Sequence, residues 1–566
     1  MSGVDASDIP GLGGSGCSQA QADAGDRTAN IQLLGVNDFH GNLEPIPNAT
    51  YRTPTDNIEG RPITCNGGPA GGAAFLDAYL DQYASSSSGS TIRVHAGDMV
   101  GASPLISSYF HDEPTIKATN LMEFDVGTLG NHEFDEGGKE MLRLIDGGQR
   151  TDGKQFKEDV NGQLVNTSDP NFSGAEYPYI SANVVYADTG KDVLQPYEIV
   201  ERDGVEVGFI GVTTEETPSI VVPDAVAPFR FLDISETVDR YAKVLQKKGV
   251  ETIVVLAHAG GNQTTATEAT GEMLSETAEM KNKAVDAIVA GHSHSYLNTT
   301  VNGKLIVEAF SLGTAFDTVN LAVSRKTGDV IKSSARVVPT CNADMQPDAE
   351  TAALVAHYDQ QITPIESRVI GTAATDITRA PAPASDITLN GQRGGESALG
   401  DLIADAQREY AGTQIAFMNP GGIRQDIQAG EVTYGELFSV QPFDNQVVQM
   451  ELTGNQILRI LEQQFEVNRI LQISGFQYTF NASNSAGQRI TSVTINGAPL
   501  DRNATYTVAA NSFLATGGDG FTVFKEASAS QQTLGSDLDA LEDYVGSLQQ
   551  PFSVPSDFGQ RITRQG

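Results

Sequence analysis

Five short apolar segments of the chain each lead directly into a polar side chain. The segments lie at 31–36, 91–95, 124–129, 251–257 and 287–290, and Asp, Asn or His follows closely after each of them. Runs that are apolar at nearly every position are typical of strands buried on both faces of a sheet. The pattern therefore predicts an α/β protein whose strand ends carry its polar chemistry.

Segments with a helical period separate these strands. An amphipathic pattern predicts helices in the first part of the chain at 73–83, 234–248 and 276–285. The stretch at 130–135 is predicted to leave the preceding strand in a turn and to begin another helix. Strands and helices thus alternate, as they do in α/β domains.

A loop-rich stretch at 339–347 divides the chain into two bodies. The helix predicted next, at 349–365, is long enough to connect them, and a second pattern starts near Val369 with a helix at 397–410 and a strand-rich region at 447–508. We therefore predict a disordered tail, a first domain, a linking helix and a C-terminal domain, with bounds at 1–28, 29–342, 343–368 and 369–566.

Length and charge narrow the possible functions. A chain of 566 residues is too long for one core, and no apolar run approaches the roughly 20 residues of a membrane span. The formal net charge is 36 − 72 = −36, which argues against stable binding to nucleic acids or to anionic membranes. An anionic small substrate remains compatible with this charge, because bound divalent cations reverse the field inside a cleft.

The three cysteines, Cys17, Cys65 and Cys341, include no Cys-x-x-Cys pair and so predict no zinc knuckle. They can form one disulfide at most, and for an exported protein we expect Cys17 to pair with Cys65. The tail at 1–28 has neither the basic start nor the apolar centre of a signal peptide.

The polar residues at the strand ends form a set of metal ligands. Oxygen and nitrogen donors without thiolates suit two divalent ions such as Zn, Mn, Co or Fe, which such sites hold about 3.5 to 4 Å apart. We expect Asp98 to bridge the ions, with three further donors on each ion. The first ion is assigned Asp38, His40 and His294, and the second Asn131, His258 and His292.

His132 is left for catalysis in this assignment. Asp135 lies three residues further on and can keep the imidazole protonated, so that His132 stabilises charge on a phosphoryl oxygen or protonates the leaving oxygen. The alternative makes His132 a metal ligand and Asn131 a helix cap. A single histidine at a strand end is often only a hydrogen-bonded rim residue, but five of the eight histidines occupy such positions here.

The ordered motifs Asp-x-His, Gly-Asp, Gly-Asn-His-Glu-Phe-Asp, Ala-His and Gly-His-x-His resemble those of calcineurin-type metallophosphoesterases. With its C-terminal part the chain is similar to the family of bacterial UDP-sugar hydrolases and 5′-nucleotidases, over about 30–562. The resemblance implies a four-layer α/β/β/α catalytic domain, joined by a helix to a smaller α+β domain that binds the nucleoside and moves over the metals.

The resemblance also implies roles for individual residues. His132 and Asp135 match the catalytic dyad of the family. The C-terminal matches are two arginines that contact the substrate, two aromatic residues that enclose the base, and two residues near the base and the ribose: Arg393, Arg424, Phe443, Phe513, Asn419 and Asp519. Stacking and guanidinium chemistry support these roles. The further arginines of some relatives have no clear match.

The predicted reaction is release of phosphate from nucleoside 5′-monophosphates, with nucleoside di- and triphosphates and UDP-sugars as further candidate substrates. Two alternatives use the same metals: a 2′,3′-cyclic nucleotide 2′-phosphodiesterase with 3′-nucleotidase activity, and an extracellular nuclease. A nucleotide-binding or adhesive protein without activity is a third, disfavoured because no ligand or dyad residue is missing. By family analogy the protein is expected to be secreted or in the cell envelope.

Overall fold

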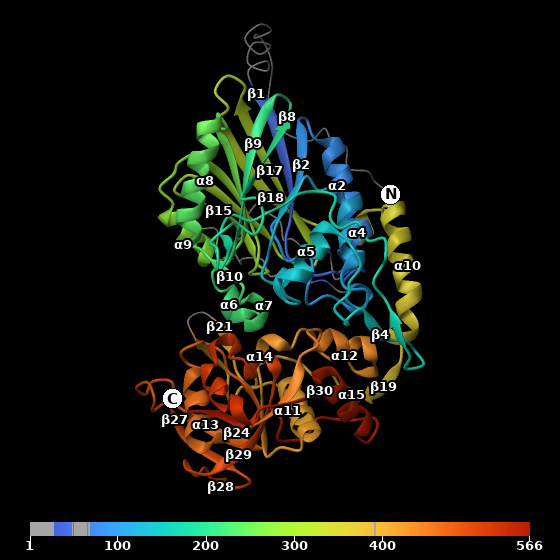
Figure 1. The fold of residues 1–566 in the computed structure, drawn as a ribbon, viewed down its shortest axis with the longest axis vertical. Coiled ribbons are helices and arrows are strands. Elements are labelled where there is room, and N and C mark those ends of the chain that lie inside the picture. Colours follow the sequence, from blue (N-terminus) through green and yellow to red (C-terminus); the bar gives the residue numbers. More distant parts are fainter. Residues whose placement is uncertain are drawn as a thin grey trace.

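The computed structural model describes residues 28–47, 49, 65, 68–265, 267–389 and 392–565. Two bodies lie one above the other in Figure 1, and a long helix, α10 (Ala349–Glu366), runs along one side of the upper body toward the lower one. The tail predicted as disordered lies outside the described residues apart from Thr28. Every helix within the described ranges is too short or too polar to span a bilayer.

The first sheet of the upper domain has the strand order β18-β17-β1-β2-β3-β6. Its strands β1, β2, β3 and β6 are parallel, and at one edge β17 pairs antiparallel with β1 and β18 pairs antiparallel with β17. The bounds are β1 (Thr28–Val36), β2 (Ser90–His95), β3 (Val126–Thr128), β6 (Tyr179–Ile180), β17 (Ala315–Ser324) and β18 (Val330–Pro339).

The second sheet has the order β15-β16-β14-β11-β9-β8. Here β9, β11, β14 and β16 are parallel, and β15 and β8 run antiparallel to them at the two edges. The bounds are β8 (Tyr197–Arg202), β9 (Val205–Thr213), β11 (Thr252–His258), β14 (Val285–Ala290), β15 (Tyr296–Val301) and β16 (Lys304–Ala309).

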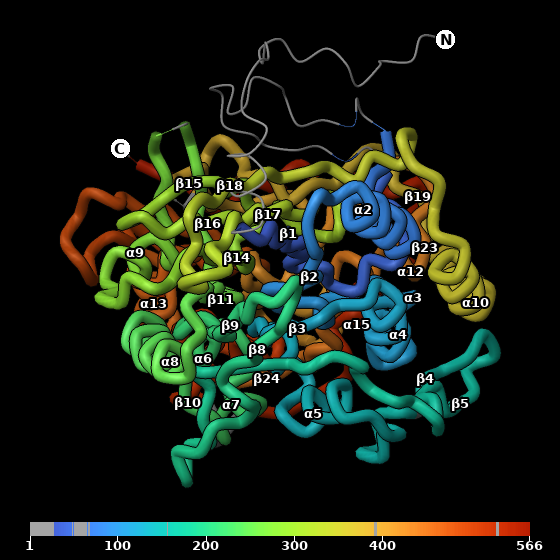
Figure 2. Tube along the Cα trace, turned by 90° about the horizontal axis from the view of Figure 1, so that it is seen from above, coloured from blue at the N-terminus to red at the C-terminus, as the bar shows by residue number. Residues whose placement is uncertain are grey.

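The two sheets pack face to face with helices on their outer faces. Leu33 and Val94 of the first sheet share one core with Phe209 and Leu256 of the second. The helices α2 (Ala73–Ser86) and α4 (Glu113–Leu121) lie on one side, and α8 (Ile234–Lys248) and α9 (Glu272–Glu279) on the other (Figure 2). The predicted four-layer α/β/β/α arrangement is confirmed.

Two sequence predictions in this domain are wrong. The helix expected at 276–285 is α9, which ends at Glu279, and Val285 already begins β14 because its apolar side chain joins the sheet core. The turn after Gly130 does not begin an α-helix. It makes a single 3-10 turn, His132–Phe134, and α5 (Gly138–Asp146) begins after a further glycine turn.

The lower domain is built on a five-stranded sheet with the order β25-β22-β29-β24-β30 and a four-stranded sheet with the order β28-β27-β26-β31. The strands are β22 (Ile415–Met418), β24 (Gln446–Thr453), β25 (Gln472–Ser474), β26 (Phe476–Phe480), β27 (Ile490–Ile495), β28 (Ala498–Pro499), β29 (Thr505–Asn511), β30 (Gln532–Ser536) and β31 (Ile562–Arg564). The helices are α11 (Ala398–Ala411), α12 (Tyr434–Val440), α13 (Gly454–Gln463), α14 (Ser512–Ala515) and α15 (Asp537–Ser547).

Helix α13 interrupts the region expected to be strand-rich. Its signal in the sequence is the capping box of Thr453 and Gln456, in which each residue's side chain bonds the other's backbone N–H. The region thus contains strands on both sides of one amphipathic helix.

Helix α10 connects the domains and belongs to the packing of the upper one. Asp348 caps its first turn by accepting from the backbone N–H groups of Glu350 and Thr351, and Tyr358 packs on Phe110 with ring centres 4.9 Å apart. Just past its end, the carbonyl of Arg368 accepts from the N–H of Tyr434 in the lower domain. The junction between the domains therefore lies at 367–369.

The disulfide expectation is also wrong. Cys65 pairs with Cys341, not with Cys17, which lies outside the described residues. Cys341 follows the end of β18, and Ala70 bridges to it, so the segment after Cys65 lies beside that strand end. The two cysteines are 276 residues apart in the chain, so the sequence alone could not show that they are neighbours.

Shorter elements complete the fold. They are α3 (Leu105–Ser108), β4 (Phe156–Glu158), β5 (Leu164–Asn166), β7 (Val184–Tyr186), α6 (Thr217–Ile220), α7 (Pro223–Val226), β10 (Phe229–Phe231), β12 (Asn262–Gln263), β13 (Ala269–Thr270), β19 (Val369–Ala373), β20 (Ile387–Leu389), β21 (Gln392–Gly394) and β23 (Gly430–Thr433).

Candidate metal centre and nucleotide site

The predicted metal ligands lie together where parallel strands of both sheets end, on the side that faces the lower domain. Their loops follow β1, β2, β3, β11 and β14. Asp38, His40, Asp98, His292 and His294 have φ between 49° and 82°, a left-handed conformation that is unfavourable for residues other than glycine. Such strained backbone persists only where surrounding contacts hold it, and it is concentrated at functional sites.

Asp38, His40 and His294 form the first group of converging donors. The Nε2 atoms of His40 and His294 are 3.1 Å apart, and Nε2 of His294 is 3.2 Å from Oδ1 of Asp38. Burial would raise the pKa of Asp38, but His294 and His258 bring it below its usual value. Burial lowers the pKa of His40 to about 3, so this imidazole is neutral. An ionised carboxylate with neutral imidazoles is the state that binds a cation.

Asp98, His258 and His292 form the second group. Oδ2 of Asp98 lies 3.0 Å from Nε2 of His258 and 3.7 Å from Nε2 of His40, so this carboxylate stands between the two groups. The amide oxygen of Asn131 is 3.1 Å from the same nitrogen of His258. The residues expected on the second ion therefore lie together, with Asn131 in contact with His258.

The hydrogen bonds behind the donors orient two imidazoles for metal binding. Nδ1 of His40 donates to the carbonyl of Gly101, and Nδ1 of His258 donates to the carbonyl of Ala96, both at 2.8 Å. A carbonyl can only accept, so these bonds leave each Nε2 to face the cluster. Histidines that bind metals commonly donate their second ring N–H to a carbonyl in this way. The residues present therefore fit two divalent cations.

The proton balance of His258 supports the same conclusion. Burial opposes its charge, yet Asp98 raises its pKa to about 10. The pKa of His292, in contrast, is lowered to about 4 by burial and by the neighbouring His258. Asp98 and His258 would hold a cation, whose charge would take the place of the proton that otherwise balances the carboxylate.

His132 and Asp135 form a hydrogen-bonded pair beside the metal donors. Nδ1 of His132 is 2.7 Å from Oδ2 of Asp135, and its backbone N–H donates to Oδ1 of Asp98 at 2.8 Å. Burial opposes protonation of His132, but Asp135 and Asp98 raise its pKa above the usual value. The pair can therefore present a cationic imidazole next to the two donor groups.

A cavity of about 730 Å³ extends from the metal donors to the lower domain. Four of the donors line it, namely Asp98, Asn131, His292 and His294. Five of the residues expected to contact the substrate also line it: Asn419, Arg424, Phe443, Phe513 and Asp519. The ring of Phe443 stacks on His132 with centres 5.8 Å apart and a 14° tilt, and the guanidinium of Arg424 lies 5.7 Å from the same phenyl ring. Also on the lower domain, Phe513 packs on Gly518 of the turn that carries Asp519.

Arg393 does not join this group. Its side chain is 62% exposed and donates to Asp386, with Nη2 and Oδ2 2.7 Å apart, on the hairpin of β20 and β21. It does not line the cavity. The substrate contact implied by the resemblance is thus absent from this arrangement of the domains.

Arg469, which the sequence did not single out, does line the cavity. Its charge lowers the pKa of Asp519, although burial of that carboxyl has the larger, opposite effect. The loop that carries Arg469 packs against the Gly-Gly-Asp-Gly turn, since a Cβ on Gly520 would lie 2.8 Å from Val467. The sequence around Arg469 contains no motif that could have predicted this position, because it depends on how two loops pack.

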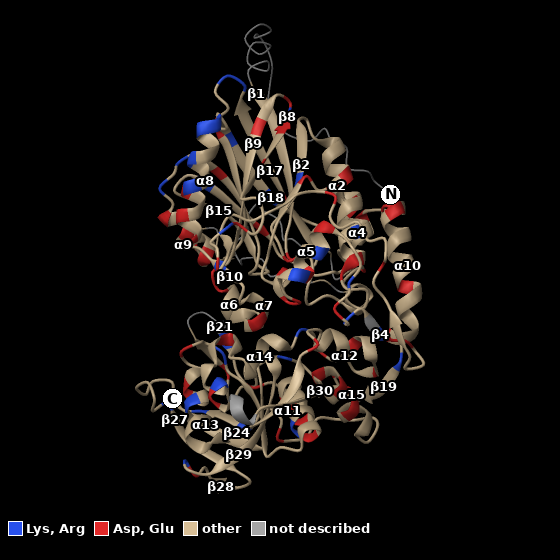
Figure 3. Ribbon diagram, viewed as in Figure 1, with Lys and Arg blue, Asp and Glu red and all other residues tan. Residues whose placement is uncertain are grey.

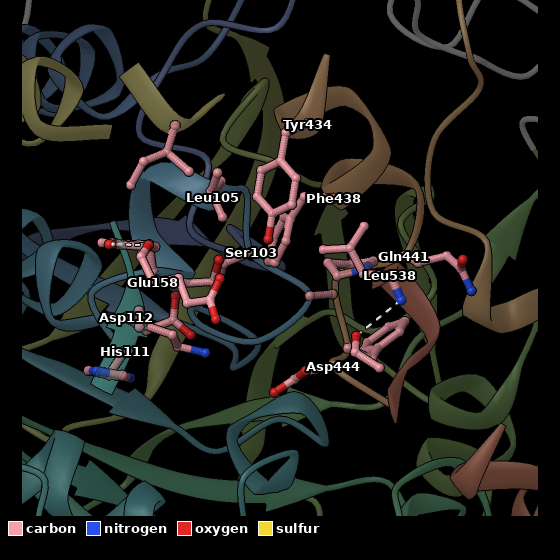
Figure 4. Close-up of a pocket in the computed structure, with 18 of the residues that line it drawn as sticks. Ser103, Leu105, His111, Asp112, Glu158, Tyr434, Phe438, Gln441, Asp444 and Leu538 are labelled. Atoms are coloured by element: carbon pink, nitrogen blue, oxygen red, sulfur yellow. Dashed lines mark hydrogen bonds between the residues drawn. The ribbon is translucent and has the colours of Figure 1, made fainter. Parts of the chain in front are cut away.

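A larger cavity of about 1040 Å³ lies between the domains on the other side of the dyad. It shares His132, Asp135 and Phe443 with the first cavity. Figure 4 shows Asp112 and Glu158 of the upper domain on one side and Asp444 of the lower domain on the other. Acidic residues outnumber basic ones along its walls, so this space repels phosphate groups.

Comparison with known proteins defines the class. Residues 31–296 match the family model described as calcineurin-like phosphoesterase, and residues 369–526 match that of the 5′-nucleotidase C-terminal domain. Fold and site are therefore those of a metal-dependent phosphoesterase. The chain belongs to the family that joins a calcineurin-like phosphoesterase domain to a 5′-nucleotidase C-terminal domain.

Individual relatives extend the comparison. The chain is 34% identical over 532 residues to endonuclease YhcR of Bacillus subtilis and 36% identical over 547 residues to cell wall protein Lmo0130 of Listeria monocytogenes. These alignments cover 92% and 90% of this chain but only 40% and 66% of the relatives. The crystal structure of a 5′-nucleotidase precursor from Thermus thermophilus matches with a TM-score of 0.73 and 28% identity, over 94% of this chain and 99% of that one.

Proposed function

We propose that the protein is a two-metal phosphohydrolase that releases phosphate from nucleoside 5′-monophosphates. One observation carries the proposal: donors from both metal groups, the His132–Asp135 pair and the residues Phe443 and Phe513 line one cavity. Such a cavity holds a phosphate at one end and a flat base at the other. Its volume lies within the usual range for small-molecule sites.

Each group of side chains has a defined task in this proposal. The two cations, when bound, neutralise the phosphoryl oxygens and activate a water molecule. His132, kept protonated by Asp135, donates a hydrogen bond to a phosphoryl oxygen or a proton to the leaving ribose oxygen. Arg424 provides a guanidinium near the same end of the cavity, and Phe443 and Phe513 hold the base by stacking.

Charge favours a small nucleotide over a polynucleotide. Figure 3 shows acidic residues distributed over both domains, and the larger cavity beside the dyad is acidic as well. A polyanion that continues past His132 would meet these walls, whereas a mononucleotide occupies only the cavity that contains Arg424 and Arg469. Nucleoside di- and triphosphates and UDP-sugars add charge only at the metal end and remain within the proposal.

The nuclease alternative rests on one observation, the similarity to a protein named as an endonuclease. A panel of 5′-AMP, UDP-glucose, 2′,3′-cyclic AMP and single-stranded DNA, assayed with Mn²⁺ at one fixed concentration, separates the candidates. The proposal predicts the highest kcat/KM for 5′-AMP. Cleavage of single-stranded DNA or of the cyclic nucleotide with higher kcat/KM would replace it with the corresponding alternative.

We further propose that closure of the lower domain on the metal centre is required for turnover. Base-binding and metal-binding residues lie on different domains and meet only across the cavity. An engineered disulfide that holds the domains apart should abolish hydrolysis until a reductant is added. Full activity in the oxidised, locked protein would contradict this requirement.

Two observations support action outside the cytoplasm. A disulfide joins Cys65 to Cys341, and such bonds persist in oxidising compartments. A relative that covers most of the chain is named as a cell wall protein. We therefore propose a secreted or cell-envelope location, to be tested by fractionating the native host with an antibody against the chain.

A further inference from the structure

Two buried glutamates contact the loops that carry the metal donors without being donors themselves. Glu133 is 6% exposed and Glu308 is fully buried. Glu133 lies in the loop after β3, next to the first sheet, and Glu308 lies on β16 of the second sheet. Each carboxylate accepts hydrogen bonds from two different loops.

Glu133 joins the loop after β2 to the loop after β3. Its Oε2 accepts from the backbone N–H groups of Asp98, at 3.0 Å, and Gly130, at 2.6 Å, while Oε1 accepts from Met99 at 2.9 Å. The two loops are in close contact here, since a Cβ on Gly130 would lie 2.0 Å from Oδ1 of Asp98. Glu133 therefore fixes the backbone of the carboxylate that stands between the two donor groups.

Glu308 joins the loop after β11 to the loop after β14. Its Oε2 accepts from the N–H of Gly261 at 3.2 Å, and its Oε1 accepts from the N–H of Ser295 at 3.3 Å. The hydroxyl of Ser293, which separates His292 from His294, lies 2.7 Å from Oε1 of the same carboxylate. Glu308 thus holds the loop that supplies one histidine to each donor group.

Asn37 connects the two halves across the sheets. Its Nδ2 donates to Oδ2 of Asp38 and to the carbonyl of Phe310, both at 2.7 Å, and its Oδ1 accepts from the N–H of Ala309 at 3.1 Å. Ala309 ends the same strand that carries Glu308. The donor loops of each sheet are thus held by one glutamate, and Asn37 links the first sheet to the end of β16.

We propose that Glu133 and Glu308 are positioning residues that hold the donor loops at the spacing two divalent cations require. A glutamate side chain offers two oxygens that can accept from several N–H groups at once, which suits this task. The strained left-handed backbone at Asp98, His292 and His294 shows that the loops need such support. The inference rests on the two-metal site but not on the identity of the substrate.

The two glutamates should respond differently when one acceptor oxygen is replaced by an amide N–H₂ of the same size. In Glu133→Gln the new amide N–H₂ must face at least one backbone N–H, because both oxygens of Glu133 accept only from such donors. In Glu308→Gln the amide N–H₂ also replaces the acceptor of one backbone N–H, but these bonds are longer, 3.2 and 3.3 Å, and the amide can donate to the hydroxyl of Ser293. Glu133→Gln should therefore be the more damaging change.

The test is titration of the metal-free protein with Mn²⁺ alone, followed by calorimetry. We expect Glu133→Gln to weaken Mn²⁺ binding by about 10- to 100-fold, and Glu308→Gln and Ser293→Ala to weaken it by a smaller factor. The matched control is Glu396→Gln in the lower domain. Glu396 is also fully buried and accepts from two backbone N–H groups, those of Arg561 and Ile562, but it touches no donor loop.

Affinities equal to wild type in both glutamate variants would overturn the proposal, as would equal losses in the Glu396→Gln control. If Glu133→Gln lacks native circular dichroism, Glu308→Gln and Ser293→Ala decide the question. A wild-type protein that binds neither Mn²⁺ nor Zn²⁺ also overturns it. The Mn²⁺ titration contains no substrate, so its result does not depend on which substrate the protein hydrolyses. Failure to hydrolyse nucleotides would therefore contradict the proposed function but not the role of the two glutamates.

Discussion

The two sides of the cavity differ in how their residues are held. The metal donors of the upper domain end strands of two packed sheets, and Asp38 and His258 are fully buried among hydrogen bonds to neighbouring loops. The residues of the lower domain that line the cavity lie on turns and helix ends, where Phe443 and Asp519 are partly exposed. Under the proposed function, the metal chemistry would thus lie at sheet edges and substrate selection on loops, which vary more readily.

Loss of the carboxylate between the donor groups should have the largest effect. Asp98→Ala removes a charge that faces both groups, so we expect kcat/KM for 5′-AMP to fall by roughly 10³-fold, together with loss of bound metal. The measurements are phosphate release and elemental analysis. Asp317→Asn is the control, because Asp317 is also buried in the first sheet but its carboxyl oxygens have no hydrogen-bond partner among the described residues. Phosphate release that survives in Asp98→Ala would contradict the two-metal assignment.

Asp135→Asn should reduce kcat by roughly 100-fold without removing metal, because it destabilises the protonated form of His132 and removes no metal donor. Asp135 helps to raise the pKa of His132, so His132 holds its proton to a higher pH in wild type than in the variant. The alkaline limb of the profile of kcat/KM against pH should therefore move to lower pH. An unshifted limb would show that His132 does not act as a cation.

On the lower domain, Phe443→Ala and Phe513→Ala should raise KM for 5′-AMP and leave metal content unchanged. Loss of one stacking partner costs about 1 to 3 kcal/mol per base, or roughly 5- to 150-fold. Phe443→Ala should also lower kcat, because its ring stacks on His132, whereas Phe513 makes no such contact. Equal kcat values in the two variants would deny a role for that stack.

Two arginines test the structure against the family resemblance. Arg469 lines the cavity and Arg393 is bonded to Asp386 outside it. We expect Arg469→Gln to raise KM by roughly 10-fold, the loss of a charged hydrogen bond, and Arg393→Gln to have little effect. The reverse result in steady-state kinetics would indicate that catalysis uses a domain arrangement in which Arg393 reaches the substrate.

The smallest effect concerns stability. Burial and Glu396 raise the pKa of Asp401 in the lower domain, opposite to the lowered pKa of Asp38 in the upper one. The folded state then holds a proton that the unfolded state has lost, so stability falls as pH rises above the unfolded value near 4, by at most about 1.4 kcal/mol per pH unit. Asp401→Asn should flatten this fall between pH 5 and pH 8 in thermal unfolding. An unchanged slope would exclude Asp401 as its source.

Much of the catalytic domain could be predicted because its signals are local. Buried strands are apolar at consecutive positions, and α8 was predicted from Ile234 to Lys248 by its period alone, as the structure has it. The prediction was wrong where local pattern and tertiary packing compete. At Val285 the apolar residue that could end a helix instead enters the sheet.

The amino-acid sequence alone determined the two-domain α/β fold and the types of donor atom at the strand ends, because apolar period and residue chemistry are properties of short segments. Tertiary packing decided which loops meet. It paired Cys65 with Cys341, brought Arg469 to the cavity while Arg393 stayed outside, and set Glu308 behind two histidines. These neighbours are far apart in the chain, so their contacts depend on how whole elements pack, which no short segment encodes.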